Sequence, residues 1–196
     1  MAKKGRPTQI YRTFEDTDRF LIEVALDNYE DLFNEWDPAP FKRRDVDPDL
    51  RNFFEECSNE ISFKHPIAIA FYIPKAEIDF EKQEKAIEGL RNFFKFNKHL
   101  VEKLIRHSRS DALHHFLVGA FFLSIAVLFE HQFEKNILAD LLGQGLFIGG
   151  WVFGWEAVST VVFKERALKE RLREWERFLD APIVFKKERK PEQDLD

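Results

Sequence analysis

Several residue types are scarce in this chain of 196 residues, and each scarcity excludes a class of site. Cysteine occurs once, as Cys57. A single cysteine excludes an intrachain disulfide and a thiolate cage for zinc, and it suits a reducing compartment. Glycine and proline number eight each, and no Gly-rich phosphate loop or nucleophile elbow is present. The residues therefore favour a protein that is not an enzyme, and they indicate no cofactor.

The chain also lacks an excess of positive charge. Its 30 lysines and arginines stand against 35 aspartates and glutamates, a net charge of -5, which argues against a nucleic-acid partner. The basic N-terminus leads into charged sequence instead of an apolar stretch, so we expect no cleavable signal peptide. The mean hydropathy of -0.39 averages a very polar part of the chain with a very apolar one.

The apolar part consists of two long uncharged runs, residues 112–129 and 141–155. Eighteen residues at about 1.5 Å each span roughly 27 Å, which is close to the hydrocarbon thickness of a bilayer. The pattern predicts a transmembrane hairpin with spans at about 112–129 and 138–158. The alternative is a buried helical hairpin in a soluble protein, which Asp140 and Glu156 beside the second run support.

Basic residues lie on both outer sides of the hairpin, whereas the connecting loop 130–136 holds Lys135 alone. They are Arg91, Lys95, Lys98, Lys103, Arg106 and Arg109 before it, and Lys164, Arg166, Lys169, Arg171 and Arg173 after it. The positive-inside rule then predicts a multi-pass protein of the inner membrane with both termini cytosolic. The expected plan is a cytosolic domain with a long helix at 11–110, the hairpin at 111–163, a helix and returning strand at 164–187, and disordered tails at 1–10 and 188–196.

Glycines cluster in the second run, where Gly145 and Gly149, and Gly150 and Gly154, form two G-x-x-x-G spacings. Such spacings let another helix approach to backbone contact. The partner helix is either the first span of the same hairpin or a second copy of the chain. Because the two pairs face different directions, both contacts are expected, and the second would make the protein a homo-oligomer.

The polar part reads as a small α/β (α+β) domain. Apolar residues alternate over 20–26 and 67–73, which predicts two strands. Asp47 and Pro48 start a helix at 48–60, so the strands should be parallel. A long helix begins near Asp79 and should continue into the first span, and residues 183–185 form a short apolar run that returns to the sheet.

Two groups of side chains carry possible chemistry. Residues 27–49 hold eight carboxylates, which could bind Mg²⁺ or Ca²⁺ or form a structured loop in which arginines pair with the acids. At the cytosolic membrane boundary, His107, Asp111 and His115 lie on one helical face, and Glu156 returns at a similar depth. These four could bind a divalent metal or relay protons, or they are interfacial residues that pair with one another or with Arg109.

Two parts of the sequence resemble the two signature blocks of an uncharacterised bacterial family of two-span membrane proteins. The first is the loop block of residues 31–41 (DLFNEWDPAPF) with its continuation 44–49 (RDVDPD), and the second is the span block of residues 145–152 (GLFIGGWV). The resemblance covers most of residues 20–187. It implies a cytosolic domain, a hairpin and a C-terminal strand, with no activity attached. It also suggests that the glycine helix and the loop are working surfaces, the loop through Phe33, Trp36, Asp37, Phe41, Arg44 and Asp45.

The function that these observations favour is an integral membrane protein with a cytosolic interaction module, which self-associates or binds a cytosolic protein. A pore-forming or membrane-disrupting effector is the alternative, because two-span effectors share this layout. A metal-dependent enzyme at the membrane interface is a third reading, and it rests on the acidic and histidine residues alone.

Overall fold

The computed structural model describes residues 11–15, 17–132 and 137–187. The tails expected at 1–10 and 188–196 lie outside the described residues. The chain divides into two units. We call Met1–Lys98 with Arg173–Asp196 the sheet unit, and His99–Leu172 the hairpin unit. Each is described by itself below.

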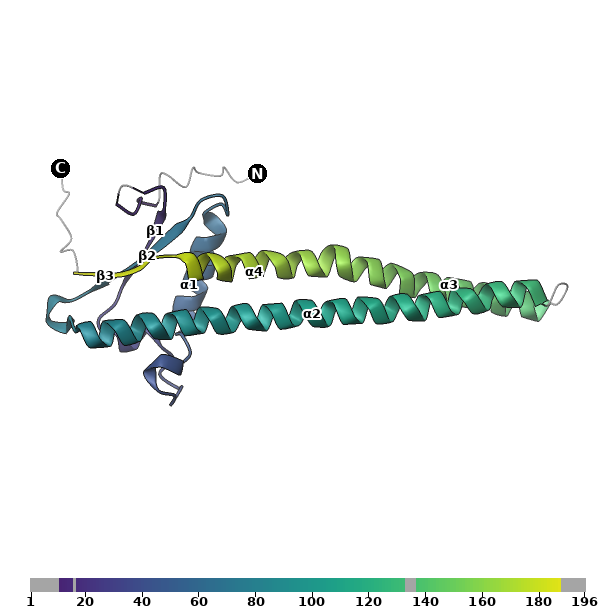
Figure 1. Ribbon diagram of the computed structural model, residues 1–196, viewed down its shortest axis with the longest axis horizontal. Helices are drawn as coiled ribbons and strands as arrows, with labels where there is room; N and C mark the ends of the chain where they lie inside the picture. Colours follow the sequence, from purple (N-terminus) through teal and green to yellow (C-terminus); the bar gives the residue numbers. More distant parts are fainter. Residues whose placement is uncertain (1–10, 16, 133–136, 188–196) are drawn as a thin grey trace. The chain divides into compact units, whose positions relative to one another are not determined.

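The sheet unit contains a three-stranded parallel sheet of β1 (Phe20–Ala25), β2 (Ile67–Ile73) and β3 (Ile183–Lys187) in the order β1-β2-β3 (Figure 1). Ile69 pairs with Ile22 on one side and with Ile183 on the other. Both alternating runs are therefore strands, as predicted, and the C-terminal run does return to the sheet. β2 is buried along nearly its whole length, as expected for the central strand of a parallel sheet that is covered on both faces.

Helix α1 (Pro48–Glu60) connects β1 to β2 and matches the prediction at both ends. The Asp47 carboxylate accepts hydrogen bonds from the backbone N–H groups of Asp49 and Leu50, at 2.9 and 3.2 Å, because the first turn of a helix leaves these donors without internal partners. At the other end, Arg177 donates to the carbonyls of Ser58 and Ile61, at 3.2 and 3.0 Å. Arg177, more than a hundred residues further along the chain, thus supplies hydrogen-bond donors to carbonyl groups at the C-terminal end of α1.

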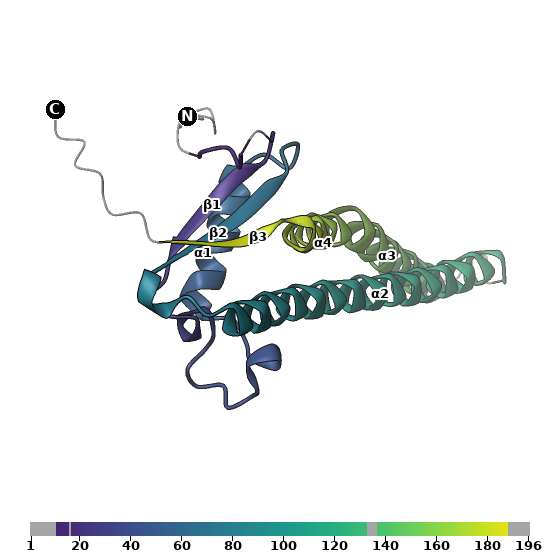
Figure 2. The same cartoon turned by 60° about the vertical axis from the view of Figure 1, so that its left-hand side comes forward.

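The core of the sheet unit is a cluster of aromatic rings on one face of the sheet. Phe54 of α1 contacts Phe71 of β2, Phe94 of α2 and Phe178 of α4, with ring centroids 5.7 to 6.3 Å apart. Figure 2 shows α1 lying across the strands. On the opposite face, Ala68 and Ala70 are buried with Leu21, and Phe14 and Tyr72 pack against them. The period of two along β2 sends alternate side chains to the two faces.

The remaining helices are long. Helix α2 (Phe80–Gln132) runs for 53 residues without a break, and Asp79 caps its start by accepting from the N–H groups of Glu81 and Lys82. The predicted continuity of the long helix with the first apolar run is confirmed. Helix α3 (Ile137–Ser159) passes through a π-helical turn, η5 (Thr160–Lys164), into α4 (Glu165–Asp180). The π turn was not predicted. Short 3₁₀ turns are η2 (Glu30–Leu32), η3 (Phe41–Arg43) and η4 (Lys75–Glu77).

Within the hairpin unit, α2 and α3 approach closely at Gly119 and Gly150. A Cβ atom added to Gly150 would lie 2.7 Å from Leu123 Cγ, and one added to Gly119 would lie 2.9 Å from the Gly150 carbonyl oxygen and 3.0 Å from the Gly154 nitrogen. A Cβ on Gly145 or Gly149 would meet no atom within 4 Å. Gly150 therefore packs on the first apolar run, with the Gly154 backbone nitrogen near Gly119. A Cβ on Gly154, Gly145 or Gly149 would meet open space, so only one member of the pair Gly150 and Gly154 faces the first run.

Candidate functional site

The loop between β1 and α1 is closed at its base by hydrogen bonds between its two ends. Phe33 and Val46 form an antiparallel bridge. The Asn34 N–H donates to the Asp45 carbonyl at 2.9 Å, and the Asp47 N–H donates to the Leu32 carbonyl at 3.0 Å. These bonds hold the two ends of loop 34–45 together, so the loop projects as one structured segment instead of an open connection.

Asp37 organises the inside of loop 34–45. Its carboxylate accepts the Ala39 N–H at 2.9 Å and the Asp45 N–H at 2.7 Å. These two backbone donors hold the pKa of Asp37 below its usual value, and the Asp45 N–H has the larger effect. They do so because they stabilise the charged carboxylate. Arg44 Nε also donates to the Ala39 carbonyl at 3.3 Å. Asp37, Arg44 and Asp45 of the predicted interaction loop thus form hydrogen bonds within the loop itself.

The aromatic residues of the predicted interaction loop differ sharply in exposure. Phe33 is 1% exposed and belongs to the core, whereas Trp36 is 92% exposed. The side chain of Phe41 lies outside the described part. Beside the loop is a cavity of about 440 Å³ whose lining includes Arg43, Asn92 and Phe96. A hydrogen-bonded loop that presents an uncovered tryptophan is a surface suited to protein recognition.

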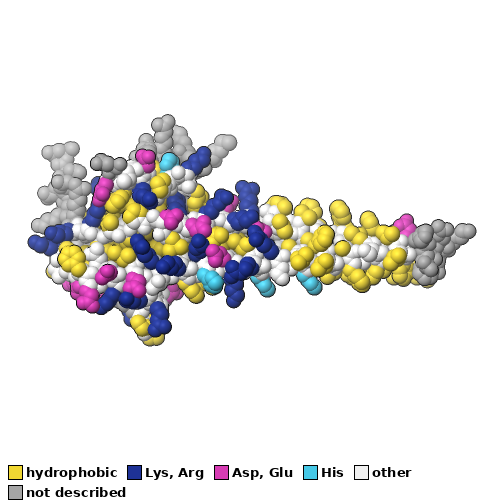
Figure 3. All heavy atoms as spheres, in the orientation of Figure 1, with side chains coloured by type: hydrophobic (Ala, Val, Ile, Leu, Met, Phe, Trp, Pro, Cys, Tyr) yellow, Lys and Arg dark blue, Asp and Glu magenta, His cyan; other side chains and the backbone are white. Residues whose placement is uncertain are grey.

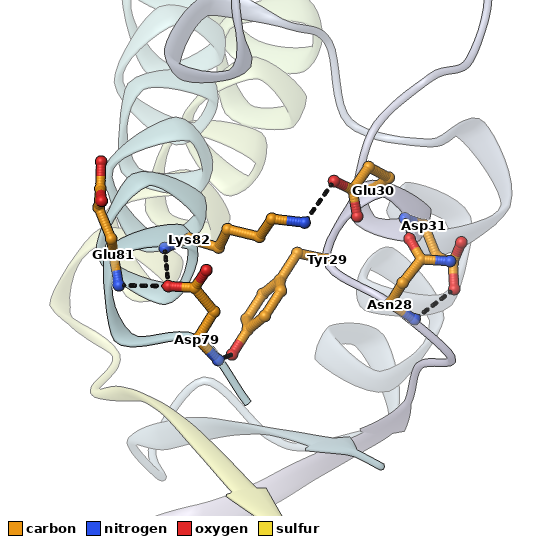
Figure 4. A network of polar contacts seen from close by, with 7 residues as sticks. All are labelled: Asn28, Tyr29, Glu30, Asp31, Asp79, Glu81 and Lys82. Atoms are coloured by element: carbon orange, nitrogen blue, oxygen red, sulfur yellow. Dashed lines mark hydrogen bonds and ion pairs between the residues drawn. The ribbon is translucent and has the colours of Figure 1, made fainter. Parts of the chain in front are cut away.

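Four of the eight acidic residues of 27–49, namely Asp31, Asp37, Asp45 and Asp47, accept hydrogen bonds from backbone N–H groups. Asp31 Oδ2 accepts the N–H groups of Asp27 and Asn28 at 3.1 and 3.0 Å. Close by, the Tyr29 hydroxyl accepts the Asp79 N–H at 3.3 Å, and Lys82 pairs with Glu30 at 3.3 Å (Figure 4). This network ties the chain after β1 to the start of α2. The structured loop thus accounts for Asp31, Asp37, Asp45 and Asp47, although their hydrogen-bond donors are backbone N–H groups instead of the expected arginines.

The predicted metal site at the membrane boundary is brought together only in part. His107 Nε2 lies 3.9 Å from Asp111 Oδ1. His115 stacks on Phe153 with centroids 6.1 Å apart, and its buried Nδ1 has no hydrogen-bond partner. Glu156 is exposed. Among residues 11–15, 17–132 and 137–187, no three His, Cys, Asp or Glu side chains form a group that could hold a metal, so this metal site stays a prediction from spacing.

The same region contains an ionic cluster that the sequence analysis missed. Glu165 is 8% exposed at its side chain, and its Oε1 lies 2.7 Å from Arg109 Nη2 and 2.9 Å from Lys169 Nζ. The hydrogen bond from Arg109, with that from Lys169, lowers the pKa of Glu165 from 4.5 to about 2. The pairing also raises the pKa of Arg109. The cluster joins α2 to α4, and the sequence signal for it was weak, because Glu165 is one of two acids among the basic residues of 164–173.

The surface of the hairpin unit is mostly apolar. Two helices, Phe80–Glu130 and Ile137–Asp180, are long and apolar enough to cross a membrane, yet only 17% of the most apolar stretch of each is buried. Figure 3 shows hydrophobic side chains spread along this unit and basic side chains gathered toward one end. The exposed basic residues of that end are Lys103, Arg106, Arg109, Lys164, Arg166, Lys169 and Arg171.

Comparison with models of protein families, with curated proteins and with solved structures finds no match to this chain. The resemblance to a two-span membrane family therefore stays a prediction from the quoted sequence blocks.

Proposed function

We propose that the chain is an integral membrane protein whose hairpin crosses the bilayer at about 112–129 and 138–158, with both termini in the cytosol, and whose sheet unit binds a partner. The observation that carries the proposal is the low burial of the two apolar helices, 17% in each case. The core helix of a soluble protein buries its apolar stripe. Exposed apolar patches of this extent mark an interaction or membrane surface, and a bilayer accounts for apolar side chains all round a helix.

Charge supports this placement and its orientation. Lys103, Arg106 and Arg109 precede the first span, and Lys164, Arg166 and Lys169 follow the second. Both sets belong to the side that the positive-inside rule assigns to the cytosol. The Arg109, Glu165 and Lys169 cluster at this level pairs the buried carboxylate of Glu165 with two cations, which is how a charge near the membrane boundary is stabilised.

The sheet unit supplies the interaction surface in this proposal. Trp36 is 92% exposed on a loop that Asp37 holds in one conformation. Tryptophan is among the residues that contribute most to binding energy at protein interfaces, and a loop already ordered loses little entropy on binding. The partner is a cytosolic protein that covers Trp36.

Self-association is the second part of the proposal. Gly145 and Gly149 lie one turn apart on α3 and have open space where a Cβ would stand. In a bilayer, such a face lets a second helix approach to backbone contact. Gly150 is already occupied by Leu123 of the same chain, so the free glycine pair is the one available to another copy.

Site-directed labelling tests the membrane placement. Burial raises the pKa of the single thiol, Cys57, and a Cys57→Ala background removes it altogether. In that background, Glu130→Cys should react with an impermeant maleimide in intact cells, and Trp36→Cys should react only after the membrane is permeabilised. The protein should also stay in the pellet during alkaline carbonate extraction. Release into the supernatant, or labelling of Trp36→Cys in intact cells, would contradict the proposal.

Co-purification tests the interaction surface. Trp36→Ala should weaken capture of a cytosolic partner by about tenfold or more, since a central tryptophan contributes about 2 kcal/mol or more at an interface. Glu35→Ala, also exposed on this loop but not lining the cavity beside it, is the matched control and should have a much smaller effect. If the Trp36→Ala protein captures the same proteins as the wild type at equal expression, loop 34–45 is not the interaction surface.

A further inference from the structure

A groove of about 510 Å³ runs along the hairpin unit between α2 and the end of α3 with η5. Ala112 and Ala157 line it and are 5% and 6% exposed, so these small side chains form its floor. Leu113 and Phe116 of α2 and Val158 and Val161 of α3 and η5 form its walls, and each is more than half exposed. The groove is thus shaped by two alanines between larger neighbours.

The π turn contributes one wall of this groove. In η5 the Glu165 N–H bonds to the Thr160 carbonyl, five residues back, which adds one residue to the turn compared with an α-helix. Val161 lies in this turn and lines the groove. π turns are rare and occur frequently at functional sites. The local widening of the helix therefore coincides with the groove.

Among the residues that the structure describes, Arg109 is the one charged residue that lines the groove. Its Nε and Nη2 donate to Glu165 Oε1 at 3.2 and 2.7 Å, and in the described part of the chain its Nη1 makes no hydrogen bond. A guanidinium has five N–H donors, so three remain for another acceptor. Arg109, Lys169 and Glu165 together carry a net charge of +1, so the cluster still attracts an anion.

The order of these features along the groove matches the order of parts in a phospholipid. Phe116 lies seven residues beyond Arg109 on α2, roughly 10 Å along the helix axis. An elongated apolar ligand in the groove would therefore end at a guanidinium. Basic pockets between membrane helices on the cytoplasmic side are known to bind anionic headgroups.

We propose that this groove binds one phospholipid with a net negative headgroup, its phosphate on Arg109 and one acyl chain between the walls of α2 and α3. The inference rests on the proposed function, since it requires the hairpin to lie in a bilayer. A soluble anion would gain nothing from the apolar walls, and a zwitterionic lipid would gain less from the net positive charge at the groove's end.

Native mass spectrometry of the full chain, released from nanodiscs with equal amounts of phosphatidylglycerol and phosphatidylcholine, tests the proposal. The wild type should retain one phosphatidylglycerol in clear preference to phosphatidylcholine. Arg109→Gln should reduce this retention about fivefold, and Arg109→Lys should keep most of it. Arg106→Gln, an exposed position of α2 that does not line the groove, is the matched control and should retain the lipid.

A second pair of variants tests the groove without touching the ion pair. Val158→Trp fills the groove and should lose the retained lipid. Val152→Trp is the control, because Val152 is 58% exposed on α3, against 52% for Val158, and does not line the groove. The proposal is overturned if the wild type retains both lipids equally, or if Arg109→Gln and Val158→Trp both retain phosphatidylglycerol as the wild type does.

Carbonate extraction of the same preparations separates this inference from the proposed function. If carbonate extracts the wild-type protein from the membrane, both the lipid site and the membrane placement are contradicted. If the protein stays in the membrane but shows no preference for phosphatidylglycerol, only the lipid site is contradicted.

Discussion

The two units of this chain place the same kinds of side chain in opposite environments. In the sheet unit Phe71 and Ile69 are 0% exposed, whereas in the hairpin unit Phe121 and Ile148 are 63% and 62% exposed. Apolar surface removed from water stabilises a fold by about 25 cal/mol per Å², so the sheet unit folds by hiding such side chains. The hairpin unit leaves them outside, which is stable only if something other than water covers them. The comparison therefore separates a unit with a buried apolar core from one whose apolar side chains are mostly exposed.

The largest expected effect comes from removing the third strand of the sheet unit. Deletion of residues 183–185 removes the pairing of Ile69 with Ile183 and the stacking of Phe185 on Phe71, whose centroids are 5.1 Å apart. We expect the sheet unit to lose most of a typical domain stability of roughly 5–15 kcal/mol, measured by hydrogen exchange in detergent. Lys187→Ala, at the exposed end of β3, should cost less than about 0.5 kcal/mol. Unchanged protection of β2 in the deletion variant would contradict the role of β3.

A pair of equal truncations tests the contrast between the two units directly. Phe54→Ala removes a ring that is 1% exposed, and Phe121→Ala removes one that is 63% exposed. The first should cost about 3–5 kcal/mol, because it leaves a cavity in a packed core. The second should cost far less in a bilayer, since lipid replaces the ring. Limited proteolysis in nanodiscs measures both, and similar losses would show that Phe121 packs against protein.

The glycines of α3 sharpen the comparison within the hairpin unit. Gly150→Leu places atoms where Leu123 and Gly119 already lie, 2.7 and 3.0 Å from its Cβ, and should cost about 1–3 kcal/mol through overpacking. Folded yield should fall. Gly149→Leu meets open space and should fold normally, but its crosslinking to a second copy in native membranes should decrease. A wild type that stays monomeric in that assay removes self-association and leaves Gly145 and Gly149 without a partner.

The smallest effect concerns acid pH and the boundary cluster. The pKa of Glu165 falls from 4.5 to about 2 on folding, so the folded state favours the charged carboxylate. This stabilisation is complete above pH 4.5 and is lost as the pH falls toward 2. Glu165→Gln should therefore show a flatter dependence of thermal midpoint on pH in that window. Glu170→Gln, which breaks the more exposed pair with Arg166, should keep the wild-type dependence. Parallel curves for wild type and Glu165→Gln would contradict the cluster.

Elements with a local signal were predicted well. Asp47 and Pro48 mark the start of α1, and the alternation over 67–73 marks β2 with its observed bounds. The long helix from the neighbourhood of Asp79 is also present. Caps, periodicity and unbroken apolar runs act over a few residues, and they can therefore be read from neighbouring positions.

Most of the candidate sites depended on contacts that no local pattern contains. The loop prediction named Trp36 and Phe33 together, yet one is exposed and the other is in the core. Gly119, which contacts α3, was not identified, because a lone glycine in a helix has no spacing to mark it. Arg109 and Glu165 are 56 residues apart, so their pairing depends on how the hairpin closes.

The sequence by itself determined which segments are polar and which are apolar, because hydropathy and charge are properties of the side chains and are read directly from their order. It also marked where the strands, α1 and α2 begin. The tertiary structure alone decided that Gly150 faces Leu123 while Gly149 faces open space, and that Arg109 ends an apolar groove. One residue along a helix turns a side chain by about 100°, so the register between α2 and α3, which only folding sets, decides which of two adjacent glycines meets a neighbour.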